Sequence, residues 1–127
     1  RNDEILSILH NIFPMPWADT NWGKRLDTRV FLEYGERFDW PSLGTAERGT
    51  HGFCHGLRTQ FAVLCDGTVV PCCLDHNGDI ALGNLFTQEL CDILNSPAAR
   101  TLHDGFTARQ RVHPLCRTCG YATRFDK

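Results

Sequence analysis

"CDGTVVPCC", residues 65–73, joins two β-rich runs through an Asp-Gly pair and places three cysteines around them. FAVLC overlaps its start and TVVPC follows the pair, and Asp-Gly between two such runs is the strongest short signal for a β-hairpin. The sequence therefore predicts a hairpin over residues 61–72, turned by a two-residue loop at Asp66-Gly67. Cys72 then lies at the end of the second strand, so the hairpin also positions a thiol.

Two short helices are predicted after the hairpin. In QELCDILN, residues 88–95, the apolar residues share one helical face, and Thr87 is a candidate N-cap. Ser96-Pro97 ends this helix and begins a second one, AARTLHDGF, because serine is a favoured N-cap and proline a favoured first helical residue.

The part of the chain before the hairpin is less regular. Residues 4–13, EILSILHNIF, have near-helical apolar spacing, which Pro14 ends. Residues 14–52 show poor periodicity and recurrent Trp, Gly and Pro, so we expect irregular structure with one strand at RVFLEY, residues 29–34. The predicted fold class is α+β: a small β-hairpin with short helices and long loops around one four-cysteine metal site.

Composition and charge restrict the class of protein. The chain has 127 residues, 42% hydrophobic and 22% charged, which is typical of a globular protein of one domain. A formal net charge of −2 gives no electrostatic reason for a nucleic-acid or anionic-membrane partner. No apolar run approaches the roughly 20 residues that span a bilayer, and the N-terminus lacks a signal-peptide pattern. We therefore expect a soluble, cytoplasmic protein.

The chain has seven cysteines, an odd number that would leave one thiol over in a fully paired disulfide framework. In a reducing compartment, clustered cysteines more often bind metals or catalyse reactions. Cys116-Arg-Thr-Cys119 is a C-x-x-C knuckle whose two sulfurs can point at one metal. The best candidates for two further ligands are Cys54, before the hairpin, and Cys72, because the folded hairpin returns Cys72 toward Cys54. A cation would offset the cost of burying four thiolates.

Two other uses of these thiols are chemically reasonable. The same four cysteines suit a structural zinc site, which would make the chain an interaction module without a redox role. A thiol oxidoreductase using Cys116 and Cys119 alone would place the pair at the start of a helix in a βαβ unit, whereas here it follows His113-Pro114. Mixed sites with histidine would draw on the imidazoles near these cysteines: His51, His55 and His113.

The order of these motifs resembles the SPASM domain, the auxiliary iron-sulfur module of many radical SAM enzymes. Cys54-x12-Gly67-x4-Cys72 is followed by LGNL, by a helix ending in ILNSPAAR and by the C-x-x-C pair, which together span residues 54–121. The resemblance implies that Cys54, Cys72, Cys116 and Cys119 hold a 4Fe-4S cluster. It also implies electron transfer or substrate positioning during the modification of a peptide, a protein or a small metabolite.

The chain departs from the full family pattern in two respects. No cysteine follows Cys119, so the resemblance is closer to the shortened, one-cluster version called twitch. The C-x-x-x-C-x-x-C triplet of a radical SAM core is also absent, so this chain alone should not be catalytic or cleave S-adenosylmethionine. Because the sequence starts with Arg, we expect that core upstream, with residues 1–50 as a bridging segment and residues 51–127 as the auxiliary-cluster domain.

The remaining cysteines and the arginines have plainer interpretations. Packing in the core is the interpretation for the three other thiols: Cys65, Cys73 and Cys91. Four arginines could donate hydrogen bonds near a negatively charged cluster and raise its reduction potential, or could simply form a solvated basic surface: Arg58, Arg100, Arg117 and Arg124.

Overall fold

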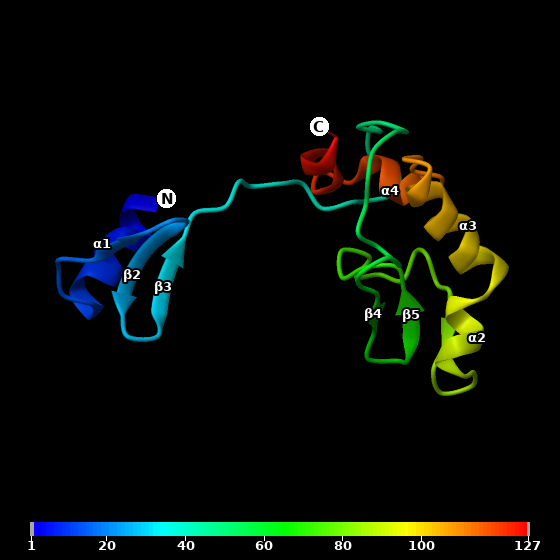
Figure 1. Cartoon of the computed structure of the whole chain (residues 1–127), viewed down its shortest axis with the longest axis horizontal. Helices are drawn as coiled ribbons and strands as arrows, with labels where there is room; N and C mark the ends of the chain where they lie inside the picture. Colours follow the sequence, from blue (N-terminus) through cyan, green and yellow to red (C-terminus); the bar gives the residue numbers. More distant parts are fainter. Residues whose placement is uncertain (1, 127) are drawn as a thin grey trace. The chain divides into compact units, whose positions relative to one another are not determined.

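The computed structural model describes residues 2–126 and confirms the predicted α+β class, with short helices and two small antiparallel sheets (Figure 1). Internal contacts divide the chain into two compact units, the first ending at Arg37 and the second beginning at Phe38. Among the described residues, no helix is long and apolar enough to cross a membrane.

The first unit contains one helix and one three-stranded sheet. Helix α1 (Asn2–Ile12) confirms the helix predicted from the N-terminal apolar spacing. Strands β1 (Ala18–Thr20), β2 (Gly23–Asp27) and β3 (Val30–Glu33) pair antiparallel in that order. β3 matches the predicted strand, whereas the expectation of otherwise irregular structure was wrong for β1 and β2.

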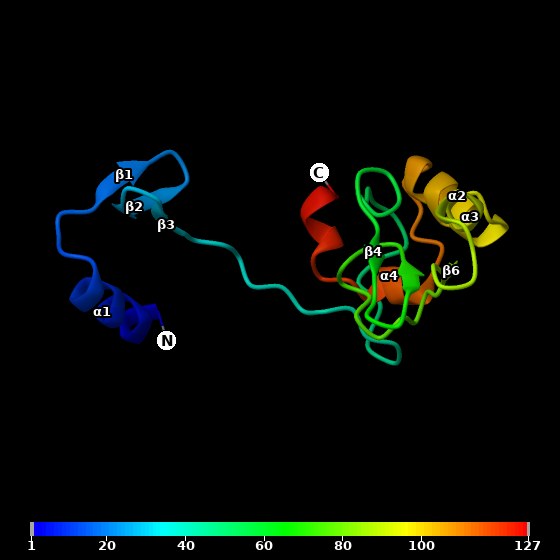
Figure 2. The same cartoon turned by 90° about the horizontal axis from the view of Figure 1, so that it is seen from below.

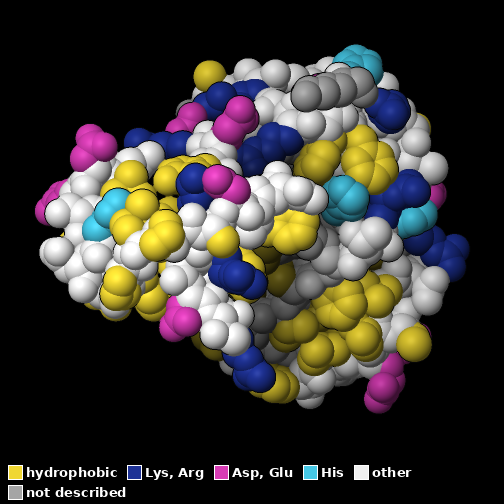
Figure 3. Space-filling view, turned by 60° about the vertical axis from the view of Figure 1, so that its left-hand side comes forward, with side chains coloured by type: hydrophobic (Ala, Val, Ile, Leu, Met, Phe, Trp, Pro, Cys, Tyr) yellow, Lys and Arg dark blue, Asp and Glu magenta, His cyan; other side chains and the backbone are white. Residues whose placement is uncertain are grey.

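The sequence of β1 and β2 shows no alternation of apolar and polar residues, because none of their residues is buried. Helix α1 likewise has no buried residue in the described part of the chain, and Ile5, Ile8 and Ile12 are exposed. Exposed hydrophobic side chains lie among charged ones on the face of the molecule in Figure 3.

The second unit is built on the hairpin, and its sheet has the order β4 (Ala62–Val63), β5 (Thr68–Val70) and β6 (Gly83–Asn84). The predicted hairpin is confirmed, but its loop has three residues rather than two. The Leu64 N–H donates to the Thr68 carbonyl at 2.8 Å, and the Gly67 N–H donates to the Leu64 carbonyl at 2.9 Å. A turn that closes with a residue of positive φ, here Gly67 at 83°, accounts for the extra residue.

Replacing Gly67 by alanine should destabilise this hairpin. Its φ of +83° is unfavourable for a residue with a side chain, and a Cβ there would lie 2.8 Å from Asn84 Oδ1 and 3.0 Å from the Phe86 ring. We expect the free energy of unfolding to fall by about 1–3 kcal/mol, measured by urea denaturation. Gly44→Ala is the matched control, because Gly44 has a φ of +85° but open space around it. Equal losses in both variants would contradict the importance of the contacts.

The helices of the second unit are α2 (Leu90–Leu94), α3 (Pro97–Thr107) and α4 (Pro114–Thr118), followed by the 3₁₀ helix η1 (Ala122–Phe125). The predicted serine cap is confirmed, because Ser96 Oγ accepts from the Ala99 N–H at 3.3 Å and proline opens α3. The predicted threonine cap is wrong: α2 begins at Leu90, and the Thr87 hydroxyl instead donates to the Asn84 carbonyl. Helix α4 was not predicted from the sequence.

The core of the second unit lies between the sheet and the helices. Helices α2 and α3 lie on one side of the small sheet in both views (Figure 1, Figure 2). Buried apolar side chains from β5, from the loop between β5 and β6 and from the helices form one cluster: Val69, Ile80, Leu82, Ile93, Ala99, Leu102, Phe106 and Leu115. The same cluster is in contact with Cys54 and Cys116, so packing of the core also fixes two of the thiols.

Candidate metal centre

The seven thiols fall into two groups by exposure. The four predicted ligands are the less exposed: Cys119 is buried and three others are half-buried, namely Cys54, Cys72 and Cys116. The other three thiols are exposed, so the interpretation that they pack in the core was wrong: Cys65, Cys73 and Cys91. Cys65 lies in the hairpin turn and Cys91 on helix α2, so local structure carries both thiols to the surface.

Each inward thiol is held by a different local structure. Cys72 follows directly after Val70 and Pro71, which are both fully buried. Cys116 lies within α4, and Cys119 ends that helix, with its N–H donating to the Cys116 carbonyl at 3.4 Å. Cys54 lies outside the helices and strands, and its Sγ accepts a hydrogen bond from the Gly56 N–H at 3.4 Å. The site thus joins the chain before the hairpin, the end of the hairpin and one short helix.

The four less exposed thiols lie near enough to act on one another's pKa values. Burial raises the pKa of Cys72 to about 11, and the neighbouring Cys54 and Cys119 add to this shift. Burial also raises the pKa of Cys116 strongly, with further contributions from the other three thiols and from Asp75. Burial raises the pKa of Cys54 as well, opposed in part by the Gly56 N–H. Every pair of the four thiols appears among these interactions.

A cavity of about 240 Å³ lies against three of these thiols and against Cys73. Its other walls are mainly apolar and aromatic: His55, Gln60, Leu74, Tyr121, Ala122 and Phe125. Within residues 2–126, no three side chains of cysteine, histidine, aspartate or glutamate lie close enough to hold one ion. Soft thiolate donors in a buried, largely apolar setting fit an iron-sulfur cluster, in which each iron takes one thiolate.

The candidate histidines have other partners. The His113 ring accepts a hydrogen bond from the Leu115 N–H at 3.2 Å and so caps α4. His51 Nδ1 lies 2.9 Å from Thr50 Oγ1. His55 lines the cavity and packs edge-on against Phe125, with ring centroids 4.9 Å apart. Their local roles are capping, hydrogen bonding and aromatic packing.

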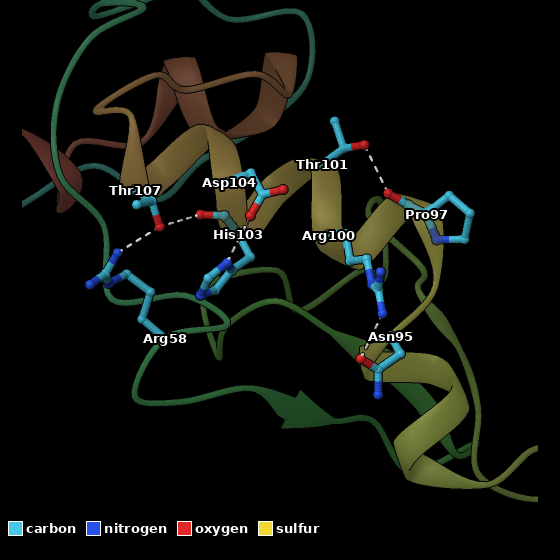
Figure 4. A network of polar contacts seen from close by, with 8 residues as sticks. All are labelled: Arg58, Asn95, Pro97, Arg100, Thr101, His103, Asp104 and Thr107. Atoms are coloured by element: carbon cyan, nitrogen blue, oxygen red, sulfur yellow. Dashed lines mark hydrogen bonds and ion pairs between the residues drawn. The ribbon is translucent and has the colours of Figure 1, made fainter.

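Two of the arginines singled out in the sequence line a wide groove of about 940 Å³ along α3 rather than the thiol cavity. Arg58 Nη1 donates to Thr107 Oγ1 at 2.7 Å, and Arg100 Nη2 donates to Asn95 Oδ1 at 3.3 Å (Figure 4). Arg124 lies over the Tyr121 ring, 4.8 Å from its centroid. Arg58 and Arg100 are therefore exposed cations, and Arg124 stacks on an aromatic ring.

Sequence reasoning missed Arg111, whose side chain is fully buried and whose charge acts on Cys54. Arg117, which was singled out, supports it by donating from Nε to the Arg111 carbonyl at 2.9 Å. In the sequence Arg111 is one of several basic residues near the C-terminus, and arginine is rarely fully buried. No local signal distinguishes it, because its burial depends on the segments around residues 50 and 122.

The two groups of thiols should differ in reactivity. In protein freed of metal by a chelator, we expect iodoacetamide to modify the exposed Cys65, Cys73 and Cys91 first, because only the thiolate reacts and access is open. A pKa of about 11 leaves about one in a thousand Cys72 thiols ionised at pH 8, a fraction that rises tenfold per pH unit up to that pKa. Peptide mass spectrometry over time measures both groups.

Denaturant supplies the control for this reactivity experiment. All seven cysteines should then react at similar rates, because burial no longer suppresses the thiolate or blocks access. If Cys72 in the native chain were modified as fast as Cys65 across pH 7–9, the buried environment of the four thiols would be contradicted.

Comparison with known proteins agrees with this geometry. A family model, SPASM, described as an iron-sulfur cluster-binding domain, matches residues 54–120 and so includes all four inward thiols. The match covers more than half of the chain. No curated protein and no solved structure matches the chain. The chain therefore belongs to the SPASM family of iron-sulfur cluster-binding domains.

Proposed function

We propose that Cys54, Cys72, Cys116 and Cys119 hold one 4Fe-4S cluster and that the chain is the auxiliary-cluster part of a radical SAM enzyme. One observation carries the choice of ligands: these four thiols are buried or half-buried, while the other three are exposed. Family membership supports an iron-sulfur cofactor, and soft thiolate donors suit it.

The proposal assigns the chain's residues a supporting role in the reaction. With four cysteines as ligands, every iron of the cluster is coordinated, so the site would favour electron transfer over direct ligation of substrate. The cluster, when bound, supplies one-electron chemistry. The apolar cavity wall would exclude water from it, and the packed core behind Cys54 and Cys116 would hold the thiols in place.

The rest of the proposal concerns the larger protein. Residues 1–50 would bridge to an upstream radical SAM core, and residues 51–127 would form the auxiliary domain. S-adenosylmethionine would bind in that core, because this chain has no C-x-x-x-C-x-x-C triplet. The substrate would be a peptide, a protein or a small metabolite in the cytoplasm.

The first test is a visible spectrum of protein purified without oxygen, with iron, sulfide and zinc measured on the same sample. We expect a brown protein with a broad visible band and about four irons per chain. A matched variant, Cys65→Ser with Cys73→Ser and Cys91→Ser, should keep the spectrum, because it removes only exposed thiols. Loss of iron in this variant would overturn the proposed ligand set.

The same experiment tests the alternative that the four thiolates bind zinc. Four thiolates can bind it as a structural ion, and zinc can replace iron in protein produced in air. A tetrahedral zinc site would need sulfurs about 3.8 Å apart, given zinc-sulfur bonds of about 2.3 Å. A colourless protein that holds zinc and stays colourless after anaerobic reconstitution with iron and sulfide would make the chain a structural interaction module.

A further inference from the structure

Arg111 has an unusual environment for a charged side chain. The side chain has no exposed surface, and its Nη2 donates to the Ala122 carbonyl at 3.1 Å and forms an ion pair with Asp126 Oδ1. Its Nε and Nη1 are buried with no hydrogen-bond partner among the described residues. Asp126, its acidic partner, keeps 36% of its side-chain surface exposed. The guanidinium is therefore buried with only part of its charge and donor capacity compensated.

The surrounding chain places this guanidinium against a residue of the thiol cavity's wall and beside the segment that leads to Cys54. Ala122, whose carbonyl accepts from Arg111, also lines the cavity that contacts three of the inward thiols. Gly52, two residues before Cys54, leaves room for the guanidinium, because a Cβ at position 52 would clash with Nη2.

The free-energy cost of burying the Arg111 charge indicates which state of the thiol site this arrangement favours. A buried charge costs several kcal/mol unless opposite charge and hydrogen bonds compensate it. Asp126 supplies one negative charge from a partly exposed position, and Nε and Nη1 have no hydrogen-bond partner among residues 2–126. The proposed cluster with four thiolates would add net negative charge on the other side of the cavity wall. The arrangement is thus most favourable when the thiol site carries its greatest negative charge.

We propose that Arg111 is a positioning residue that stabilises the reduced form of the cluster site and so raises its reduction potential. This inference rests on the proposed function. Reduction adds one electron, supplied by an electrode or by dithionite, and makes the site more negative by one charge. A fixed cation behind Cys54 favours that state, as charges and hydrogen bonds near a cluster are known to tune potentials.

The test is a potentiometric titration of the anaerobically purified chain with its cluster, comparing Arg111→Met with Asp126→Asn. We expect Arg111→Met to lower the potential and Asp126→Asn to raise it. At a fixed ambient potential, each change should alter the ratio of reduced to oxidised cluster about tenfold, as a unit charge does in a partly buried setting. Arg111→Lys should stay nearer the parent because it keeps the charge.

A structural role alone would not produce shifts of opposite sign, because both variants break the same ion pair. Arg58→Met is the matched control: Arg58 lies closer to Cys54 in sequence but is exposed, and the potential should not change. If Arg111→Met fails to retain a cluster, the Asp126→Asn variant provides the test instead. A reduction potential of Asp126→Asn equal to the parent's would then overturn the inference. A parent chain without a cluster would instead refute the proposed function, and this inference with it.

Discussion

Replacing Cys72 by alanine should abolish cluster binding and destabilise the chain far more than replacing any of the three exposed cysteines. Cys72 contributes one of four thiolates, and a site with three cannot hold the same fully ligated cluster. The free energy of metal binding in a small domain is largely free energy of folding. We expect the free energy of unfolding to fall by more than about 3 kcal/mol relative to the loaded parent.

The measurement is iron content with a thermal melt, both under anaerobic conditions. Cys91→Ala is the matched control, because Cys91 is exposed on α2 and should keep both the iron and the melting temperature of the parent. A melting curve of Cys72→Ala identical to the parent's, or full iron retention, would remove Cys72 from the site. Cys72 is the most informative of the four because the buried Val70 and Pro71 leave its backbone little freedom to adjust.

Much of this architecture could be predicted because its signals are local. The hairpin followed from an Asp-Gly pair between β-rich runs, and the start of α3 followed from Ser96-Pro97. The α+β class followed from both. The four less exposed thiols could also be distinguished from the other three in the sequence, by the spacing of Cys54 to Cys72 and by the C-x-x-C pair. These features need only neighbours along the chain, or the pairing of two adjacent strands.

The parts that were missed depend on contacts between distant segments. Strands β1 and β2 are too exposed to show an alternating apolar pattern. Helix α4 has five residues, too few for a periodic signal, and depends on its cap and on the buried Leu115. The burial of Arg111 arises where its N–H meets the Thr50 carbonyl and its side chain meets Ala122. Composition and spacing along the chain carry none of this information.

Removing the buried carboxylate of Asp75 should strongly destabilise the second unit. It is 2% exposed, and its carboxylate accepts hydrogen bonds from the Asp79 N–H at 2.9 Å and from the Ile80 N–H at 2.8 Å. These bonds fold the loop after Cys72 and Cys73 so that Ile80 enters the core. Hydrogen bonds to a charged acceptor contribute about 1.5–3 kcal/mol each, and burying their donors unpaired is costly.

Asp75→Ala should therefore lower the free energy of unfolding by about 3–5 kcal/mol, measured by urea denaturation of the metal-free and loaded chains. Asp75→Asn should lose less, because its amide oxygen can still accept one bond. Asp79→Asn is the matched control four residues away, where the side chain is exposed and only the backbone N–H takes part. If Asp75→Ala lost no more than Asp79→Asn, the loop would be held by the packing of Ile80 and Leu82 rather than by the carboxylate. If the loss appeared only in the loaded chain, Asp75 would act through placement of Cys72, because the loop that it closes begins there.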